Sequence, residues 1–358
     1  MPAAIGLRGM VDPGVAAREQ EYTEAFAAAR PFRHVVIDRF LDAGFCRRMV
    51  EQFPDFDESA ALNEDGKVGG KATRESVRSL GPAYAELDDL VQTKAFRELV
   101  GRITGIDDLQ YDPHYFGGGT HENRQGQDLD PHIDFNYHPL SKQHRRLNLI
   151  IYLNGEWDDA WGGSLQLHRD PYREPAQDDI VTVKPLMNRC VMFETSEHSW
   201  HGFPRIELPE DKRHLSRKSF ALYYYTVSRP GAELGPEHST IYVEQHLPED
   251  LAPGEPLSPE RVQHIRNLVA SRDQHLRRLY GNIKQLYTEL NELKERYGLQ
   301  APPGVADEPA GSVGPSAEER ARGHEDADSP EDVVDAPGSE GVANEEAPEI
   351  ALDRLAAE

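Results

Sequence analysis

The 358-residue sequence has only two cysteines and no apolar run of the roughly 18 residues that a membrane-spanning helix needs. Cys190 lies within the apolar run 190–193, so we expect buried free thiols here and at Cys46 rather than a disulfide. The first residues also lack the continuous apolar core of a signal peptide. These absences predict a cytoplasmic protein in a reducing compartment, with no membrane partner.

Basic side chains are also scarce, with 39 lysines and arginines against 63 aspartates and glutamates, which gives a formal net charge of −24. A nucleic-acid partner is therefore not expected, because phosphate binding needs a basic surface. Residues 301–358 hold 16 acidic and 3 basic side chains, which is 13 of the 24 net negative charges, and not one Phe, Trp or Tyr. We therefore expect residues 300–358 to form a disordered acidic tail.

The N-terminal part of the chain alternates helical spacing with one β-branched run. Helices are expected over 15–30, which ends before Pro31, over 40–53 and over 84–106, and a strand is expected over 32–38. We assign residues 1–31 to an N-terminal helical segment and residues 32–232 to the main domain.

From Leu109 onward the pattern changes to short apolar runs bounded by Gly, Pro, Asn and Asp. Strands are expected at 110–116, 132–137, 147–153, 163–167, 180–183, 189–193, 202–206 and 219–227. Short strands at such spacing indicate an all-β sandwich or barrel. Its open end is where we expect the chemistry-bearing side chains.

A proline-rich linker, 233–257, precedes a long helical segment, 258–299, in which Ser258 is the expected N-cap. Apolar residues from Val262 to Tyr297 recur in steps of three and four, which forms a seam of five heptads. Two interpretations remain open: a helix that lies on its own domain, and a coiled coil that makes a homodimer. Gly281 is a point at which the helix could break in two.

A candidate metal site begins with His132 and Asp134, which are two residues apart. In a strand, residues i and i+2 point to the same face, so the imidazole and the carboxylate can converge on one ion. A third ligand is needed from a strand that returns beside the first, and His201 is the candidate, with His198 as its competitor. Two histidines and one carboxylate on one side of an ion are the arrangement of non-heme Fe(II) oxygenases. The same spacing at His324 and Asp326, inside the acidic tail, is taken as meaningless.

Six motifs occur in an order that resembles one enzyme family. They are Tyr115–His121, Pro131–Pro139, Arg145–Asn154, Trp161–Leu167, His201–Pro204 and Arg217–Tyr225. Over about residues 32–230 the chain resembles the prolyl-hydroxylase-like branch of the Fe(II)/2-oxoglutarate dioxygenases, most of all its uncharacterised bacterial members. The resemblance implies a mainly β fold with flanking helices, namely a double-stranded β-helix or jelly roll.

The same resemblance implies the cofactors and the roles of single residues. Fe(II) and the cosubstrate 2-oxoglutarate are expected, with ascorbate as a further cofactor to consider. The resemblance places His132, Asp134 and His201 at the iron positions, Arg217 at the distal carboxylate of 2-oxoglutarate, and Tyr152 and Tyr115 in the cosubstrate pocket. A charged insertion before Arg217 contains Lys212 and Arg213, which could be mistaken for that cation.

The activity that the resemblance implies is hydroxylation of an unactivated C–H bond by O₂, with release of succinate and CO₂. The substrate would be a protein side chain of the prolyl type or a small biosynthetic intermediate such as a sugar. A metal-binding, cupin-like jelly roll without oxygenase activity, an isomerase or a sensor, is the alternative. A scaffold that acts through its coiled coil and tail is a third interpretation.

Overall fold

The computed structural model describes residues 9–61, 71–244 and 256–297, together with residues 7, 247, 251 and 254. It divides into two compact units, Met1–Leu290 and Asn291–Glu358. The acidic tail and its His324–Asp326 pair lie outside the described residues. Within the described part, no helix combines the length and the apolar character needed to cross a membrane.

The first unit is built on two antiparallel sheets. The larger has the strand order β1-β9-β6-β11-β4-β2, and β3 also pairs with β11. Its strands are β1 His34–Asp38, β2 Ala72–Arg74, β3 Gln110–Tyr111, β4 Gly119–Asn123, β6 His144–Tyr152, β9 Arg189–Glu194 and β11 Arg217–Thr226.

The smaller sheet has the order β12-β5-β10-β7-β8. Its strands are β5 Leu129–Ile133, β7 Leu165–Leu167, β8 Val181–Val183, β10 His201–Phe203 and β12 Ile241–Tyr242. Apolar side chains from both sheets form one cluster, with Tyr152 and Phe193 from the larger and Leu165 and Leu167 from the smaller. The two sheets therefore pack against each other through an apolar layer.

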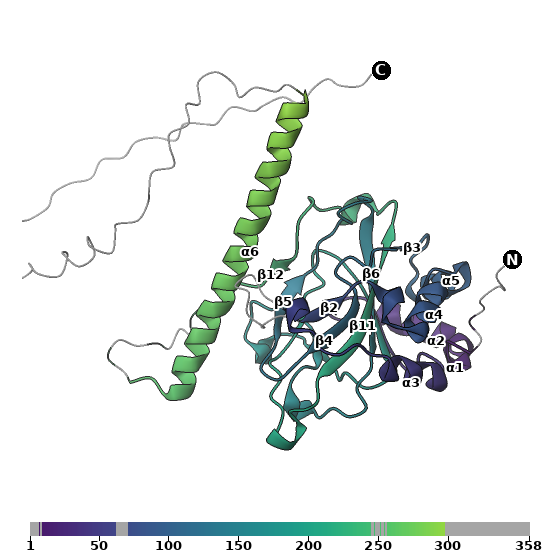
Figure 1. Ribbon diagram of the computed structural model, residues 1–358, viewed down its shortest axis with the longest axis horizontal. Helices are drawn as coiled ribbons and strands as arrows, with labels where there is room; N and C mark the ends of the chain where they lie inside the picture. Colours follow the sequence, from purple (N-terminus) through teal and green to yellow (C-terminus); the bar gives the residue numbers. More distant parts are fainter. Residues whose placement is uncertain are drawn as a thin grey trace, which may run out of the picture. The chain divides into compact units, whose positions relative to one another are not determined.

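Helices lie together against the outer face of the larger sheet (Figure 1). They are α1 Pro13–Ala17, α2 Glu19–Ala28, α3 Ala43–Glu51, α4 Pro82–Val91 and α5 Lys94–Thr104. The main core fills the space between them and that face, and it includes the fully buried Phe96, Leu149 and Phe220. Cys46 and Cys190 are buried and free, as predicted.

Two of the predicted helices are each split into two. The 84–106 prediction is wrong at its centre, because the hydroxyl of Thr93 accepts a hydrogen bond from the backbone N–H of Phe96 and so starts α5 as a separate helix. In the 15–30 segment the break falls at Arg18, between α1 and α2.

Register decides which side chains of the larger sheet face the smaller one. Tyr152 in β6 lies opposite Ser219 in β11, Ser219 opposite His121 in β4, and His121 opposite Thr73 in β2. Residues directly opposite each other in antiparallel strands point to the same face. This row, and the residues two positions along each strand, therefore face the smaller sheet, whereas Phe220 faces the helices.

Several strand boundaries differ from the predictions. Only Gln110–Tyr111 of the 110–116 segment is a strand, and β5 ends at Ile133 instead of continuing to Tyr137. The strands β2, β4 and β12 were not predicted. All five residues of β4 are buried although two of them are charged or ionisable, so the strand has no alternation that periodicity could detect.

The helix α6, Pro259–Tyr297, runs through Gly281, so the suggested break there is wrong. A glycine in a helix interior costs only about 1 kcal/mol, which a 39-residue helix tolerates. Ser258 caps the helix as predicted, because its hydroxyl accepts from the backbone N–H of Arg261 at 3.2 Å. The heptad seam is exposed at Leu276, Leu286 and its other positions from Val269 onward.

Candidate metal centre

The two predicted histidines lie on neighbouring strands of the smaller sheet. β10 pairs antiparallel with β5 so that His201 lies directly opposite His132, and the prediction of a returning strand is confirmed. Asp134 follows β5 rather than belonging to it, because the strand ends at Ile133. Its carboxylate oxygens nevertheless lie 3.7 Å from Nε2 of His132 and 3.5 Å from Nε2 of His201. One atom from each of the three lies within 4.8 Å of the others.

Backbone hydrogen bonds orient both imidazoles. Nδ1 of His132 lies 2.9 Å from the carbonyl oxygen of Asp130, and Nδ1 of His201 lies 2.9 Å from that of Ser199. A carbonyl only accepts, so each Nδ1 carries the proton and each Nε2 has a free lone pair. Both lone pairs are thus available on the side where the Asp134 carboxylate lies, as a metal site requires.

Asp134 is held by two side chains from β6. Nδ2 of Asn148 donates to Oδ2 at 2.8 Å, and the guanidinium of Arg145 lies 3.0 Å from the same oxygen. Arg145 is itself buried, and its guanidinium lies over the rings of Phe135 and Tyr223. These contacts fix the carboxylate in one orientation and stabilise its charge.

The electrostatics of the three residues suit metal binding. Burial lowers the pKa of His132 to about 3 and also lowers the pKa of His201, so both rings are neutral near pH 7. For Asp134, burial is the largest single effect and favours the protonated form, but Arg145 and the other polar groups around the carboxylate together outweigh it, and the pKa is lowered. Two neutral imidazoles and one ionised carboxylate are therefore ready to bind a divalent cation without first losing protons.

Arg217 and Tyr152 lie together on the same face of the larger sheet. Nη2 of Arg217 donates to the Tyr152 hydroxyl at 3.1 Å, and Nε donates to the carbonyl of Gly163 at 2.6 Å. Burial lowers the pKa of Arg217, although its guanidinium remains charged at any ordinary pH. Among the described residues no acceptor contacts its Nη1, which leaves a directed donor for a carboxylate.

Gly163 belongs to the Trp161-Gly-Gly motif. Only a glycine fits at this position. Its φ is +67°, and an added Cβ would lie 2.9 Å from the Trp157 ring and 3.4 Å from Cδ of Arg217. The glycine therefore lets the backbone approach the guanidinium. The motif thus positions Arg217 in addition to forming a turn.

The other sequence candidates lie elsewhere. The hydroxyl of Tyr115 donates to Asp88, and its ring packs on Phe220 at the helix-covered face, so the structure does not bring Tyr115 together with Arg217. His198 is exposed and is not among the grouped ligands. Lys212 forms an ion pair with Glu156 in the inserted loop, so it is not the cation of the pocket.

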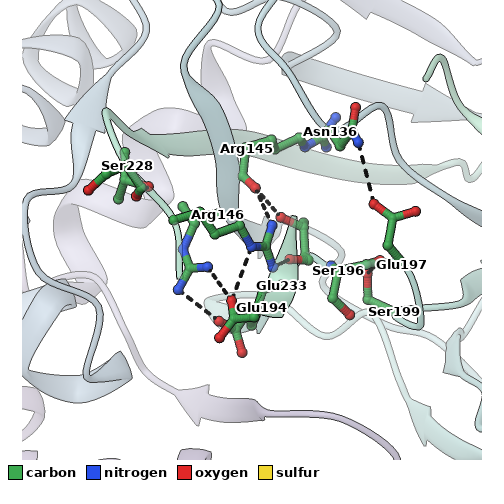
Figure 2. A network of polar contacts seen from close by, with 12 residues as sticks. Asn136, Arg145, Arg146, Glu194, Ser196, Glu197, Ser199, Ser228 and Glu233 are labelled. Atoms are coloured by element: carbon green, nitrogen blue, oxygen red, sulfur yellow. Dashed lines mark hydrogen bonds and ion pairs between the residues drawn. The ribbon is translucent and has the colours of Figure 1, made fainter. Parts of the chain in front are cut away.

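Polar contacts join the segments that carry the ligands (Figure 2). The amide of Asn136, two residues after Asp134, bonds to Glu197, four residues before His201, at 3.4 Å. Nearby, Arg146 of β6 forms ion pairs with Glu194 and Glu233. The loop that follows β5 is therefore joined to the loop that precedes β10, and the segment after β11 is joined to β6.

Sequence reasoning missed four residues at the site: Lys71, Arg145, Asn148 and Tyr242. Asn148 could have been found, because it is an even number of residues from Tyr152 and so shares its face. The ring of Tyr242 packs against His132 in a tilted arrangement, with ring centroids 5.2 Å apart, because β12 pairs with β5. Nothing in the sequence predicted that pairing, and Lys71 lies in a segment without a recognisable motif.

The class of protein is defined by its fold and by its site. The fold consists of two packed antiparallel sheets, and a group of two histidines and one carboxylate lies between them. An arginine that is hydrogen-bonded to a tyrosine lies nearby. Residues 118–225 match the sequence model of the 2OG-Fe(II) oxygenase superfamily. That segment holds His132, Asp134, His201 and Arg217, so the match agrees with the predicted resemblance to the Fe(II)/2-oxoglutarate-dependent dioxygenases, whose cofactors are Fe(II) and 2-oxoglutarate. The two imidazole nitrogens and the carboxylate oxygen lie close enough together to bind one ion, and two histidines with one carboxylate are the donors that a non-heme Fe(II) centre uses.

Particular relatives can also be named. The chain is 30% identical over 139 residues to prolyl 3-hydroxylase OGFOD1 of Mus musculus, which covers 35% of this chain and 24% of the mouse protein. It therefore spans about a quarter of the length of that curated relative. Among solved structures, a prolyl hydroxylase from Trichoplax adhaerens, in complex with a peptide of hypoxia inducible factor, is 15% identical, with 59% and 92% of the two chains covered and a TM-score of 0.39. HygX of Streptomyces hygroscopicus, with nickel and 2-oxoglutarate bound, is 12% identical, with 60% and 95% covered and a TM-score of 0.39.

Proposed function

We propose that this protein hydroxylates an unactivated C–H bond with Fe(II), 2-oxoglutarate and O₂, and that it releases succinate and CO₂. The observation that carries the proposal is the convergence of the free Nε2 atoms of His132 and His201 on the carboxylate of Asp134. When bound, iron with 2-oxoglutarate supplies the oxidising power, and the protein supplies orientation and exclusion of water.

In this proposal His132, Asp134 and His201 bind the iron from one side. Asn148 and Arg145 hold the Asp134 carboxylate in its ionised form, so that it remains a ligand throughout. Three ligands on one side leave positions open for the cosubstrate and O₂.

Arg217 binds the distal carboxylate of 2-oxoglutarate, with the Tyr152 hydroxyl beside it. A charge in a pocket lined by Phe203 and Tyr152 needs a directed, charged donor, and a guanidinium provides one better than an ammonium does. Gly163 and Tyr152 hold the guanidinium in place before the cosubstrate arrives.

The substrate is a protein side chain of the prolyl type or a small biosynthetic intermediate. The mouse relative, named as a prolyl 3-hydroxylase, supports the first class. A cupin-like metal protein without oxygenase activity is the alternative, and the buried Arg217 beside the site disfavours it.

We further propose that the two sheets form a jelly roll, and that the domain limits expected from the sequence hold. The exposed seam of α6, with Leu279 at 46% and Leu286 at 62% exposure, supports a homodimer through residues 258–297. Other residues of the helix contact its own domain: Ser271 bonds to Asp130, and His275 stacks on Tyr242. The seam residues Leu276 and Leu279 line the same hollow as Tyr242 and His275, so the homodimer proposal rests mainly on the seam beyond them, such as Leu286.

The test is to incubate Fe(II)-loaded protein with 2-oxoglutarate, O₂ and a lysate fractionated by size. We expect succinate, and a mass increase of one oxygen atom in one fraction, by mass spectrometry. A shift confined to peptides would identify a protein substrate. If no 2-oxoglutarate is consumed with any fraction, the proposal is wrong and the metal-binding alternative is favoured.

A further inference from the structure

Lys71 lies on the same face of the larger sheet as the cosubstrate pocket. It precedes β2 by one residue, and Thr73, two positions further, lies opposite His121. Because i and i+2 of an extended chain share a face, Lys71 points to the side that carries His121 and Tyr152. Continuing the register places Lys71 opposite Asn123, which in turn lies opposite Arg217.

The polar neighbour of the Lys71 ammonium is a histidine that carries no negative charge. Nζ lies 3.4 Å from Nε2 of His121, and the same Nε2 lies 3.0 Å from the carbonyl oxygen of Gly117. That carbonyl already accepts a hydrogen bond from the Tyr223 hydroxyl at 3.0 Å, so Nε2 can at most offer Lys71 the lone pair of a neutral ring, which is not an anion. Burial lowers the pKa of His121 well below its usual value, so the ring is neutral and supplies no negative charge.

The nearby carboxylates are already in use. Asp134 is bound by Arg145 and Asn148, and Oε1 of Glu75 accepts the backbone N–H of Gly117 at 2.7 Å. Among the described residues no carboxylate oxygen lies within 4.0 Å of Lys71 Nζ. Burial lowers the pKa of Lys71 to about 8, so most of the ammonium is still charged at pH 7. Lys71 is half-buried, and a cation that is partly removed from water without an anion beside it is destabilised, which makes this position a candidate site for an anion.

The cosubstrate does not account for this cation. Tyr152 is in β6, Arg217 in the adjacent β11, and Lys71 precedes β2, which is two strands from β11 on the other side. At about 4.8 Å per strand, Lys71 and Arg217 start about 10 Å apart. A carboxylate bound between Arg217 and Tyr152 therefore leaves the Lys71 ammonium available for a second ligand.

We propose that Lys71 binds an anionic group, a carboxylate or a phosphate, of the molecule that is hydroxylated. The inference rests on the proposed function and names the substrate's chemical class: an acid whose anionic group lies close to the oxidised C–H bond. In a protein substrate this would be an acidic or phosphorylated residue near the target. In a small molecule it would be an acid or a phosphate ester.

The test uses full-length protein loaded with Mn(II) and 2-oxoglutarate, with paired dipeptide probes. Acetyl-prolyl-glutamate amide and acetyl-prolyl-phosphoserine amide carry the anion, and the glutamine and serine versions are neutral controls. Broadening of the probe's proton resonances by Mn(II) reports binding close to the metal. We expect broadening for at least one anionic probe and for neither neutral one, and the stronger of the two anionic probes identifies the group.

Three variants separate the possible roles of Lys71. In Lys71→Met the apparent affinity for the anionic probe should fall roughly tenfold or more, because a charge-assisted hydrogen bond is lost. Lys71→Arg should retain most of that affinity. Lys212→Met, which removes a half-buried lysine paired with Glu156 in the inserted loop, should match the wild type.

Calorimetric titration of 2-oxoglutarate and the midpoint of thermal unfolding serve as controls on each variant. If Lys71→Met weakens 2-oxoglutarate binding by the same factor, Lys71 belongs to the cosubstrate pocket and the inference is wrong. Equal broadening by charged and neutral probes, or none by any probe, also overturns it. Failure of the wild type to bind 2-oxoglutarate at all would instead refute the proposed function.

Discussion

The larger sheet and the helix α6 carry similar leucines in opposite surroundings. Leu149 in β6 is 0% exposed, whereas Leu286 in α6 is 62% exposed. Each lies in a regular apolar pattern, of alternating or heptad spacing. The pattern therefore shows which face of an element is apolar, and the rest of the fold decides whether the same chain covers that face.

The same contrast holds for charged residues. Arg145 and Arg217 are 1% and 5% exposed, and each has polar partners that fix its orientation. The lysines and arginines near the end of α6, such as Lys284 and Arg296, lie on a helix surface where charge costs little. The buried charged residues of the sheets indicate where the candidate active site lies. The exposed apolar residues of α6 indicate a candidate protein–protein interface.

The strongest test of this contrast removes the ligands. His132→Ala, Asp134→Ala and His201→Ala should each abolish Fe(II)-dependent succinate formation, because two remaining ligands bind the ion poorly. His198→Ala replaces an exposed histidine three residues before His201, and it should retain most of the activity. Metal content after dialysis should follow the same order. An active His201→Ala protein would contradict the assignment.

Substitution of Arg217 should affect the binding of 2-oxoglutarate and leave iron binding unchanged. Arg217→Ala should raise the 2-oxoglutarate concentration for half-maximal turnover about 10- to 150-fold, since a charge-assisted bond is worth about 1.5–3 kcal/mol. Arg217→Lys keeps the charge but loses the directed fork, so we expect a smaller rise. Iron affinity should barely change.

Arg213→Ala is the matched control, in the inserted loop just before β11. Steady-state kinetics with varied 2-oxoglutarate should show no change for it. If Arg213→Ala raises the requirement and Arg217→Ala does not, the cosubstrate pocket lies at that loop instead.

A leucine pair compares stability in the two regions directly. Leu149→Ala should lower the free energy of unfolding by about 2–5 kcal/mol, because it leaves a cavity in the buried core. Leu286→Ala should change it by less than about 0.5 kcal/mol in dilute protein. Urea titration at low protein concentration gives both values. A large effect at Leu286 would mean that the seam is covered even in the monomer.

Leu286→Glu should have the smallest effect on the free energy of unfolding. It should change the self-association of the protein instead. A charge in the seam should shift full-length protein from dimer to monomer in sedimentation, while succinate formation stays unchanged. Arg266→Glu, at an exposed position outside the seam, is the control. If wild type and Leu286→Glu both run as monomers, the homodimer proposal is wrong.

The sequence was most informative where chemistry requires a fixed spacing. His132, Asp134 and His201 could be selected from motif and spacing, and the structure brings them together although β5 ends before Asp134. Arg217 and Tyr152 were found through the family resemblance. The break at Thr93 could have been predicted from its capping ability, but helical spacing continued across it.

Other parts could not be predicted because they depend on long-range pairing. β4 is buried throughout, so its polar residues give no alternation. Tyr242 reaches His132 only because β12 pairs with β5, and Lys71 lies on the face of the larger sheet that carries Tyr152 only through the register of β2 and β4. A single sequence carries no signal for either pairing.

The most direct test of the metal centre is an anaerobic calorimetric titration of 2-oxoglutarate into the full-length protein, with and without Fe(II). We predict one molecule bound per chain, with tight binding only when Fe(II) is present. In Asp134→Ala the iron-dependent part should be absent, and in Arg217→Ala binding should weaken about 10- to 150-fold. Binding that is equally tight without metal, or no binding with it, would contradict the account.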